Sequence, residues 1–113
     1  MPQSEADSRK PVKIAFPSEV RVASGVSTGL VLRKVQPVYP PEARQDRIQG
    51  TVRMTAVISE AGNVVDLEVI DGPIELAVSA VNAVRLWKHR PYLLNGTPVK
   101  MRTEIIVNYF LSQ

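Results

Sequence analysis

Two stretches of the chain alternate between apolar and mostly polar residues, as half-buried strands do. The first covers residues 52–58, and in the second Val65, Leu67 and Val69 alternate with acidic residues. Between them, residues 60–63 (Glu-Ala-Gly-Asn) predict a tight hairpin, because Gly and Asn accept positive φ. Gly72-Pro73 ends the second stretch. The pattern therefore predicts an antiparallel strand pair.

Residues 74 to about 88 change to a helical period. Their apolar positions recur at three- and four-residue spacing and form one stripe: Ala77, Ala80, Val81, Val84 and Trp87. Pro91 lies shortly beyond this helix, and Asn95-Gly96 marks another turn. A shorter helix is predicted over about Pro41–Arg47, because a proline suits the first turn of a helix.

Lys100–Leu111 reads as one long strand. One face carries Met101, Ile105, Val107, Tyr109 and Leu111, and the other carries Arg102, Glu104, Ile106, Asn108 and Phe110. At ~3.3 Å per residue the strand is about 40 Å long, whereas the helix over 74–88 covers only about 22 Å at ~1.5 Å per residue. Part of the strand should therefore project beyond the helix, and an uncovered strand edge is a place where another chain can pair.

We expect three parts along the chain: a frayed tail over 1–11, an arm over 12–35 and a compact domain over 36–113. The arm has short β-favouring pieces at 12–16, 20–22 and 30–32, with turn and loop residues over Ser24–Gly29. Nothing in the pattern holds the arm tightly, so it should pack loosely on the domain.

Composition excludes some classes of protein. The 113 residues are enough for one domain with a modest core, and 44% hydrophobic content argues against disorder throughout. The net charge of +3 is spread along the chain without a basic run, so nucleic acid is not an expected partner. There is no cysteine, no apolar run long enough to span a membrane and no signal peptide in the first ten residues. We expect either a cytosolic protein or a domain whose anchor and linker precede this sequence.

Several pieces occur in an order that resembles the TonB C-terminal domain family. They are Gln36–Pro40, Ala43, Arg47–Val52, Ala61–Val64, Ala83–Trp87 with Pro91, Asn95–Val99 and Ile106–Phe110. Each piece alone is weak, but the ordered set is specific, and it spans residues 36–111.

The resemblance implies an α+β, two-layer fold in the order helix–strand–strand–helix–strand, with two helices on one face of a three-stranded antiparallel sheet and an extended arm in front. It implies a non-enzymatic, energy-transducing adaptor in the periplasm, anchored in the inner membrane, without cofactor or metal. Its partners would be the TonB box of outer-membrane receptors and a proton-driven inner-membrane motor. An alternative role for the same fold is the extracytoplasmic domain of a membrane sensor or protease regulator. The long strand also makes a homodimer possible.

The resemblance also assigns partner-binding residues. One set is the segment Gln36, Pro37, Val38, Tyr39 and Pro40, and the other lies on the last strand: Ile105, Ile106, Val107, Asn108 and Phe110. Addition of the partner as an extra strand would suit an adaptor, because backbone pairing depends little on side-chain identity. This chain departs from the family by having His89 where many members have an aromatic residue, and Glu42 where some have arginine.

Individual residues also have plainer interpretations. Trp87 closes an amphipathic helix and is expected in the core, whereas Tyr39 is either a partner contact or a lid on the sheet. Ile106 and Phe110 point away from the predicted core face and favour a partner surface. His89 is the only histidine and has no cysteine or second histidine with which to bind zinc.

Overall fold

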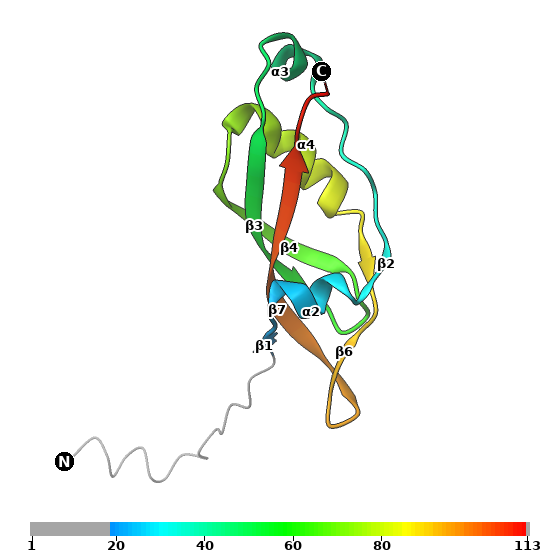
Figure 1. Cartoon of the computed structure of the whole chain (residues 1–113). Helices are drawn as coiled ribbons and strands as arrows, with labels where there is room; N and C mark the ends of the chain where they lie inside the picture. The colour runs from blue at the N-terminus through cyan, green and yellow to red at the C-terminus, as the bar shows by residue number, and fades with distance from the viewer. Residues whose placement is uncertain (1–18, 113) are drawn as a thin grey trace, which may run out of the picture.

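The computed structural model describes residues 19–112, which form seven strands and three helices (Figure 1). In chain order the elements are β1 (Glu19–Arg21), α2 (Ser24–Thr28), β2 (Val31–Arg33), α3 (Pro41–Gln45), β3 (Gly50–Ile58), β4 (Val64–Asp71), α4 (Ile74–Val84), β5 (Lys88–His89), β6 (Tyr92–Leu94) and β7 (Thr97–Tyr109). The predictions for the tail over 1–11 and for the strand piece at 12–16 concern residues outside this described range.

β7 is the central strand of a five-stranded sheet within residues 19–112, in the order β1-β7-β3-β4 with β6 also paired to β7. β3 runs antiparallel to β7 from Gly50 opposite Tyr109 to Ile58 opposite Met101. β4 is antiparallel to β3, and β6 forms a hairpin with the start of β7. β1 is parallel to β7 over Lys100–Arg102, and a separate two-stranded sheet joins β2 and β5.

The core lies against one face of this sheet. Val52, Met54, Ala56 and Ile58 of β3 are completely buried, as their period of two predicts. On β7 the same face carries Met101, Thr103, Ile105, Val107 and Tyr109, all buried. The other face of the sheet carries charged and polar side chains, including the ion pair between Arg53 and Glu104 at 2.9 Å.

Two helices cover the core face. α4 packs against β3 and β4 and buries Leu76, Ala80, Ala83 and Val84. α2 lies on β7, where Thr103 Oγ1 donates a hydrogen bond to Ser27 Oγ at 2.8 Å. α3 lies at the end of the sheet near the C-terminus, and the β6–β7 hairpin projects past α2 at the other end (Figure 1). The mixed α+β fold is therefore confirmed. The part that projects past α2 is the β6–β7 hairpin, which pairs at Thr97–Val99 and so lies before the predicted strand Lys100–Leu111.

The arrangement of the elements differs from the prediction of three antiparallel strands under two helices. The sheet has more strands, includes the parallel pair β1–β7, and is covered by α2 and α4. Ser24–Thr28, predicted as a loop, is helical. Residues 19–35 are not loosely attached, because Val22 is 6% exposed and its N–H donates to the Arg102 carbonyl oxygen at 2.9 Å.

Some element boundaries and faces were also predicted wrongly. α3 ends at Gln45, α4 at Val84, and β7 at Tyr109, so Leu111 lies outside the strand. The helical stripe includes Leu76, which packs inward in place of Ala77. A register shift between Val57 and Ile58 leaves Val65 outside the ladder; Val64 pairs with Ile58 and packs on the core, whereas Val65 is exposed.

Gly62 in the β3–β4 hairpin gives the first test of this fold. Its φ is +88°, and a Cβ built there would lie 1.9 Å from the carbonyl oxygen of His89. Gly96 is a matched control, with φ +83° and no atom within 4 Å of such a Cβ. We expect Gly96→Ala to lower the free energy of unfolding by about 1–2 kcal/mol and Gly62→Ala by roughly 4 kcal/mol or more. Equal losses in urea unfolding would contradict the close contact between the hairpin and β5.

Candidate functional site

One edge of β7 is open over part of its length. β1 pairs with this edge at Lys100–Arg102, and beyond Arg102 no strand within residues 19–112 continues the pairing. The opposite edge of β7 is bonded to β3 as far as Tyr109. We call the open part, Glu104–Tyr109, the β7 edge.

The hydrogen bond between Val22 and Arg102 shows which backbone groups of β7 point toward the open side. The Arg102 carbonyl accepts a hydrogen bond from Val22 N–H, so the backbone groups of Arg102 point toward the open side. Because these directions alternate along a strand, the N–H and C=O groups of Glu104, Ile106 and Asn108 point the same way. Those of Ile105 and Val107 point toward β3.

The side chains of the β7 edge divide between the two faces of the sheet. Ile105 and Val107 are buried in the core, so they present neither a side chain nor free backbone groups to a partner. Ile106 is 45% exposed on the open face, and Phe110, just beyond the strand, is 68% exposed. Asn108 Oδ1 accepts a hydrogen bond from Thr51 Oγ1 at 2.8 Å.

β1 lies directly before the β7 edge and is held there by its own ion pair. Glu19 Oε1 accepts a hydrogen bond from Arg102 Nε at 2.7 Å. This bond lowers the pKa of the Glu19 carboxyl, with smaller electrostatic contributions from Arg102, Lys100 and Arg21. The same side of β7 that is open at Glu104 therefore already carries one added strand, which ends opposite Arg102.

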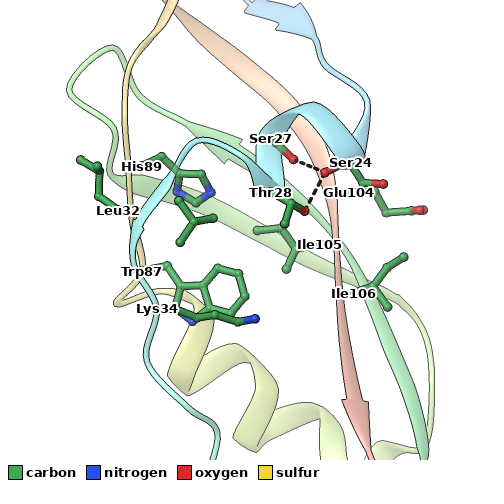
Figure 2. A pocket seen from close by; sticks show the side chains of 11 residues that line it. Ser24, Ser27, Thr28, Leu32, Lys34, Trp87, His89, Glu104, Ile105 and Ile106 are labelled. Atoms are coloured by element: carbon green, nitrogen blue, oxygen red, sulfur yellow. Dashed lines mark hydrogen bonds between the residues drawn. The ribbon is translucent and has the colours of Figure 1, made fainter.

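A cavity of about 390 Å³ adjoins the β7 edge. Its walls come from three parts of the chain, as Figure 2 shows: α2 and the following segment, the stretch after α4, and β7. Its lining is half polar and half apolar. The residues are Ser24, Ser27, Thr28, Val31, Leu32, Lys34, Trp87, His89, Glu104, Ile105 and Ile106.

Two aromatic rings form one side of this cavity. Trp87 is 7% exposed and donates from Nε1 to the Val35 carbonyl at 2.9 Å, so it is a core residue as predicted. His89 is 1% exposed, and its Nδ1 is buried without a hydrogen-bond partner. Burial lowers the pKa of the His89 imidazole, because the charged form is desolvated there. Lys34 Nζ lies 5.3 Å from the centre of the Trp87 ring.

The segment Gln36–Pro40 lies along α4 and meets the β7 edge at the last residue of that edge, Tyr109. Ser79 Oγ of α4 donates to the Val38 carbonyl, and the Tyr39 hydroxyl donates to the Ile48 carbonyl. The Tyr39 ring packs edge-on against Tyr109 with centroids 5.4 Å apart, which places the segment against the end of β7. Tyr39 thus acts as a lid on the sheet, whereas Gln36 and Val38 face solvent.

A second hollow of about 480 Å³ separates this segment from the outer face of α4. Its lining is largely apolar and includes Val38 and Pro40 from the segment and Val78 and Leu86 from the helix. Val38 is 76% exposed. The two predicted sets of partner-binding residues therefore lie in different surroundings, joined through the Tyr39–Tyr109 contact.

Sequence reasoning missed Glu104, whose backbone faces the open side, and the residues of the cavity. Lys34 and Ser24–Thr28 lay in the segment predicted to be a loose arm. Within residues 19–112 there is no helix long and apolar enough to cross a membrane. The same residues contain no group of three or more His, Asp or Glu side chains placed to hold a metal ion.

Comparison with known proteins identifies the family. Residues 35–111 match the family model of the Gram-negative bacterial TonB protein C-terminal. Protein TonB of Vibrio cholerae is 36% identical over 84 residues, which are 73% of this chain and 34% of that protein. The chain therefore spans about a third of the length of that relative. The chain belongs to the TonB C-terminal domain family, as its sequence motifs predicted.

Two solved structures have the same fold. The solution NMR structure of the Pseudomonas aeruginosa TonB C-terminal domain aligns with a TM-score of 0.63 at 22% identity, covering 74% of this chain and 86% of that one. A structure of the TonB2 protein from Vibrio anguillarum aligns with a TM-score of 0.57 at 23% identity, covering 92% of this chain and 94% of that one. At these identities the alignments establish the fold alone.

The burial of His89 predicts a pH-dependent stability. Unfolding returns the imidazole to its ordinary pKa near 6.5, so the unfolded chain takes up a proton before the folded one as pH falls. The free energy of unfolding should therefore decrease as pH falls through 6.5 and level off below the folded pKa. The charged groups that line the same cavity are Lys34 and Glu104.

Urea unfolding between about pH 5 and 8 measures this effect, in the pH range where an ordinary histidine titrates. His89→Gln removes the imidazole, and since the chain has no other histidine, the variant should lose the slope near pH 6.5. An unchanged slope in the variant would assign the pH dependence to other groups.

Proposed function

We propose that this domain is the partner-binding module of a TonB-type energy transducer in the periplasm. It binds the TonB box of an outer-membrane receptor as an added strand on the β7 edge and carries no catalytic activity. A proton-driven motor in the inner membrane supplies force, which reaches the receptor through this contact. The observation that carries the proposal is the open β7 edge, together with membership of the TonB C-terminal domain family.

The energetics of strand addition suit such an adaptor. Glu104, Ile106 and Asn108 offer their N–H and C=O groups to a partner, and each hydrogen bond formed contributes about 0.5–1.5 kcal/mol net. The cost of ordering a peptide offsets part of this gain, so the affinity should be about micromolar at best. Contact of that strength allows release and rebinding.

The other open edge of the sheet is a poorer acceptor. Within residues 19–112, β4 pairs only with β3, so its outer edge is also unpaired. However, two register shifts interrupt its ladder, and Asp66, Glu68 and Asp71 line it with negative charge. Irregular pairing and charge are the usual protections of an edge strand against unwanted addition. The β7 edge is therefore the better acceptor of an added strand.

Gln36, Pro37, Val38, Tyr39 and Pro40 form a second contact in this proposal. Gln36 and Val38 are exposed beside the hollow on α4, and they are the members of the segment free to touch a receptor. Tyr39 and Pro40 are half-buried and hold the segment in place. On β7, the proposed contacts are the backbone of Glu104, Ile106 and Asn108 and the side chains of Ile106, Asn108 and Phe110.

An NMR titration of the labelled domain with TonB-box peptides from receptors of the same genome tests strand addition. The amides of Glu104, Ile106 and Asn108 should shift most, and those of β4 should stay in place. Ile106→Pro removes an N–H that points outward and should weaken binding at least about tenfold, since it blocks pairing at the centre of the edge.

Ile106→Ala is the matched control, because it shortens the same side chain and keeps the N–H. It should lose only the apolar contact of the side chain and should therefore bind more tightly than Ile106→Pro. Strand addition is excluded if both variants bind equally, or if the shifts fall on β4. Concentration-dependent shifts at the β7 edge without peptide would instead indicate pairing between two copies of the domain.

A further inference from the structure

The two-stranded sheet of β2 and β5 brings two positive charges together. It lies beside the main sheet (Figure 1), and next to a register shift Arg33 pairs with Lys88. Residues opposite each other in an antiparallel pair share one face, and like charges in such positions destabilise the pairing. Positions that break a local rule of stability in this way are expected at functional sites.

Both side chains line a hollow of about 400 Å³, together with Arg85 at the C-terminal end of α4. We call the hollow lined by Arg33, Arg85 and Lys88 the basic hollow. Leu86 also lines it and is 62% exposed, so an apolar side chain lies among the three cations. Leu32 and Lys34 line the cavity beside β7 instead, so the basic hollow and the β7 edge lie on different sides of this segment.

The cations of the basic hollow are not paired with acidic groups of the described chain. The ion pairs within residues 19–112 are made by Arg53 and Arg102 on the open face of the main sheet. Glu60 and Asp66, the acidic residues of the adjoining hairpin and strand, are exposed and form no ion pair in the same range. The end of α4 favours the charge of Arg85, but this does not neutralise the other two cations.

Lys88 is held in place within the basic hollow. Its Nζ donates hydrogen bonds to the Ala61 carbonyl at 2.9 Å and to Asn63 Oδ1 at 2.7 Å. Both acceptors are uncharged, and an ammonium group has three N–H donors, so its charge is not balanced and one donor remains. Because the half-buried side chain is already ordered, binding an anion costs it little conformational entropy.

We propose that the basic hollow is a second interaction surface, which binds an acidic segment of a partner protein. Carboxylates of that segment would pair with Arg33 and Lys88, and an apolar side chain beside them would pack on Leu86. A concave site with apolar lining suits a protein segment better than the flat surface of an anionic membrane. Complementary charge at such a surface speeds association and selects the partner. This proposal does not depend on strand addition at the β7 edge.

Two peptides test the surface by NMR titration of the labelled domain: acetyl-GEELEEG-amide and its uncharged counterpart acetyl-GQQLQQG-amide. The Glu peptide should shift the amides of Arg33, Asn63 and Lys88. The Gln peptide should bind at least about tenfold more weakly, because it loses several ion pairs that each contribute up to about fivefold. The difference should shrink when ionic strength is raised from about 0.1 M to 1 M.

Variants at Arg33 separate the basic hollow from a general effect of charge. Arg33→Gln should weaken binding of the Glu peptide about threefold to fivefold, the effect of one exposed ion pair. Arg44→Gln removes the same charge from an exposed arginine of α3, outside the hollow, and should change the affinity less than about twofold. Arg33→Glu places a carboxylate opposite Lys88, so it should abolish binding and raise the midpoint of urea unfolding.

Each other outcome overturns the proposal. Equal losses of affinity in Arg33→Gln and Arg44→Gln would assign the attraction to net charge. A lower urea midpoint in Arg33→Glu would show that this side chain does not face Lys88. If phosphatidylglycerol vesicles shift the amides of the basic hollow and the Glu peptide does not, the surface binds a membrane and not an acidic segment.

The same variants distinguish this inference from the proposed function. Arg33→Gln should bind TonB-box peptides as the unaltered domain does, with shifts at Glu104, Ile106 and Asn108. If those peptides fail to shift the β7 edge while the Glu peptide binds the basic hollow, the proposed function fails and this inference stands. If the Glu peptide shifts only the β7 edge, this inference fails.

Discussion

The antiparallel pairing of β3 with β7 is the interaction on which the rest of the structure depends. Nine residues of β3 pair with β7, and apart from Val57 the buried residues of both strands lie on the same face. That shared face gives α2 and α4 a surface to cover. Because β7 is longer than β3, it also has residues left to pair with β6, and its other edge pairs with β1. One strand thus organises the core and leaves an unpaired edge beyond β1.

Local sequence pattern predicted the elements that carry their own periodicity. β3, β7 and α4 each repeat apolar residues at the period of their structure, so their existence followed from the sequence. α2 could not be predicted in this way, because Ser24–Thr28 is flanked and interrupted by glycine and built from weak helix formers. Contacts with a distant strand, such as Thr103 with Ser27, accompany this helix. Likewise, the pairing of Val20 with Met101 joins segments about eighty residues apart that share no local signal.

The candidate site was predictable to a similar extent. The alternation along β7 correctly separated exposed Ile106 and Phe110 from buried Val107 and Tyr109. It did not show which residues turn their backbone groups to the open side, since that depends on which edge β3 occupies. The cavity joins residues near 24–34, 87–89 and 104–106, so no single stretch of sequence contains it. The contact of Lys34 with the Trp87 ring likewise joins residues that lie far apart in the sequence.

Backbone hydrogen bonds and side-chain contacts would contribute differently to the affinity and the selectivity of the proposed site. Backbone hydrogen bonds along Glu104–Asn108 would accept many sequences, which serves an adaptor with more than one receptor. Discrimination then requires a side-chain contact, and a partly enclosed site strengthens such a contact more than the open face of the sheet does. Lys34, which lines the cavity beside β7, is itself exposed, and on the open face Arg53 is already paired with Glu104. With neither charge both enclosed and unpaired, the selectivity of the proposed site should depend on the apolar side chains that the β7 edge exposes, Ile106 and Phe110.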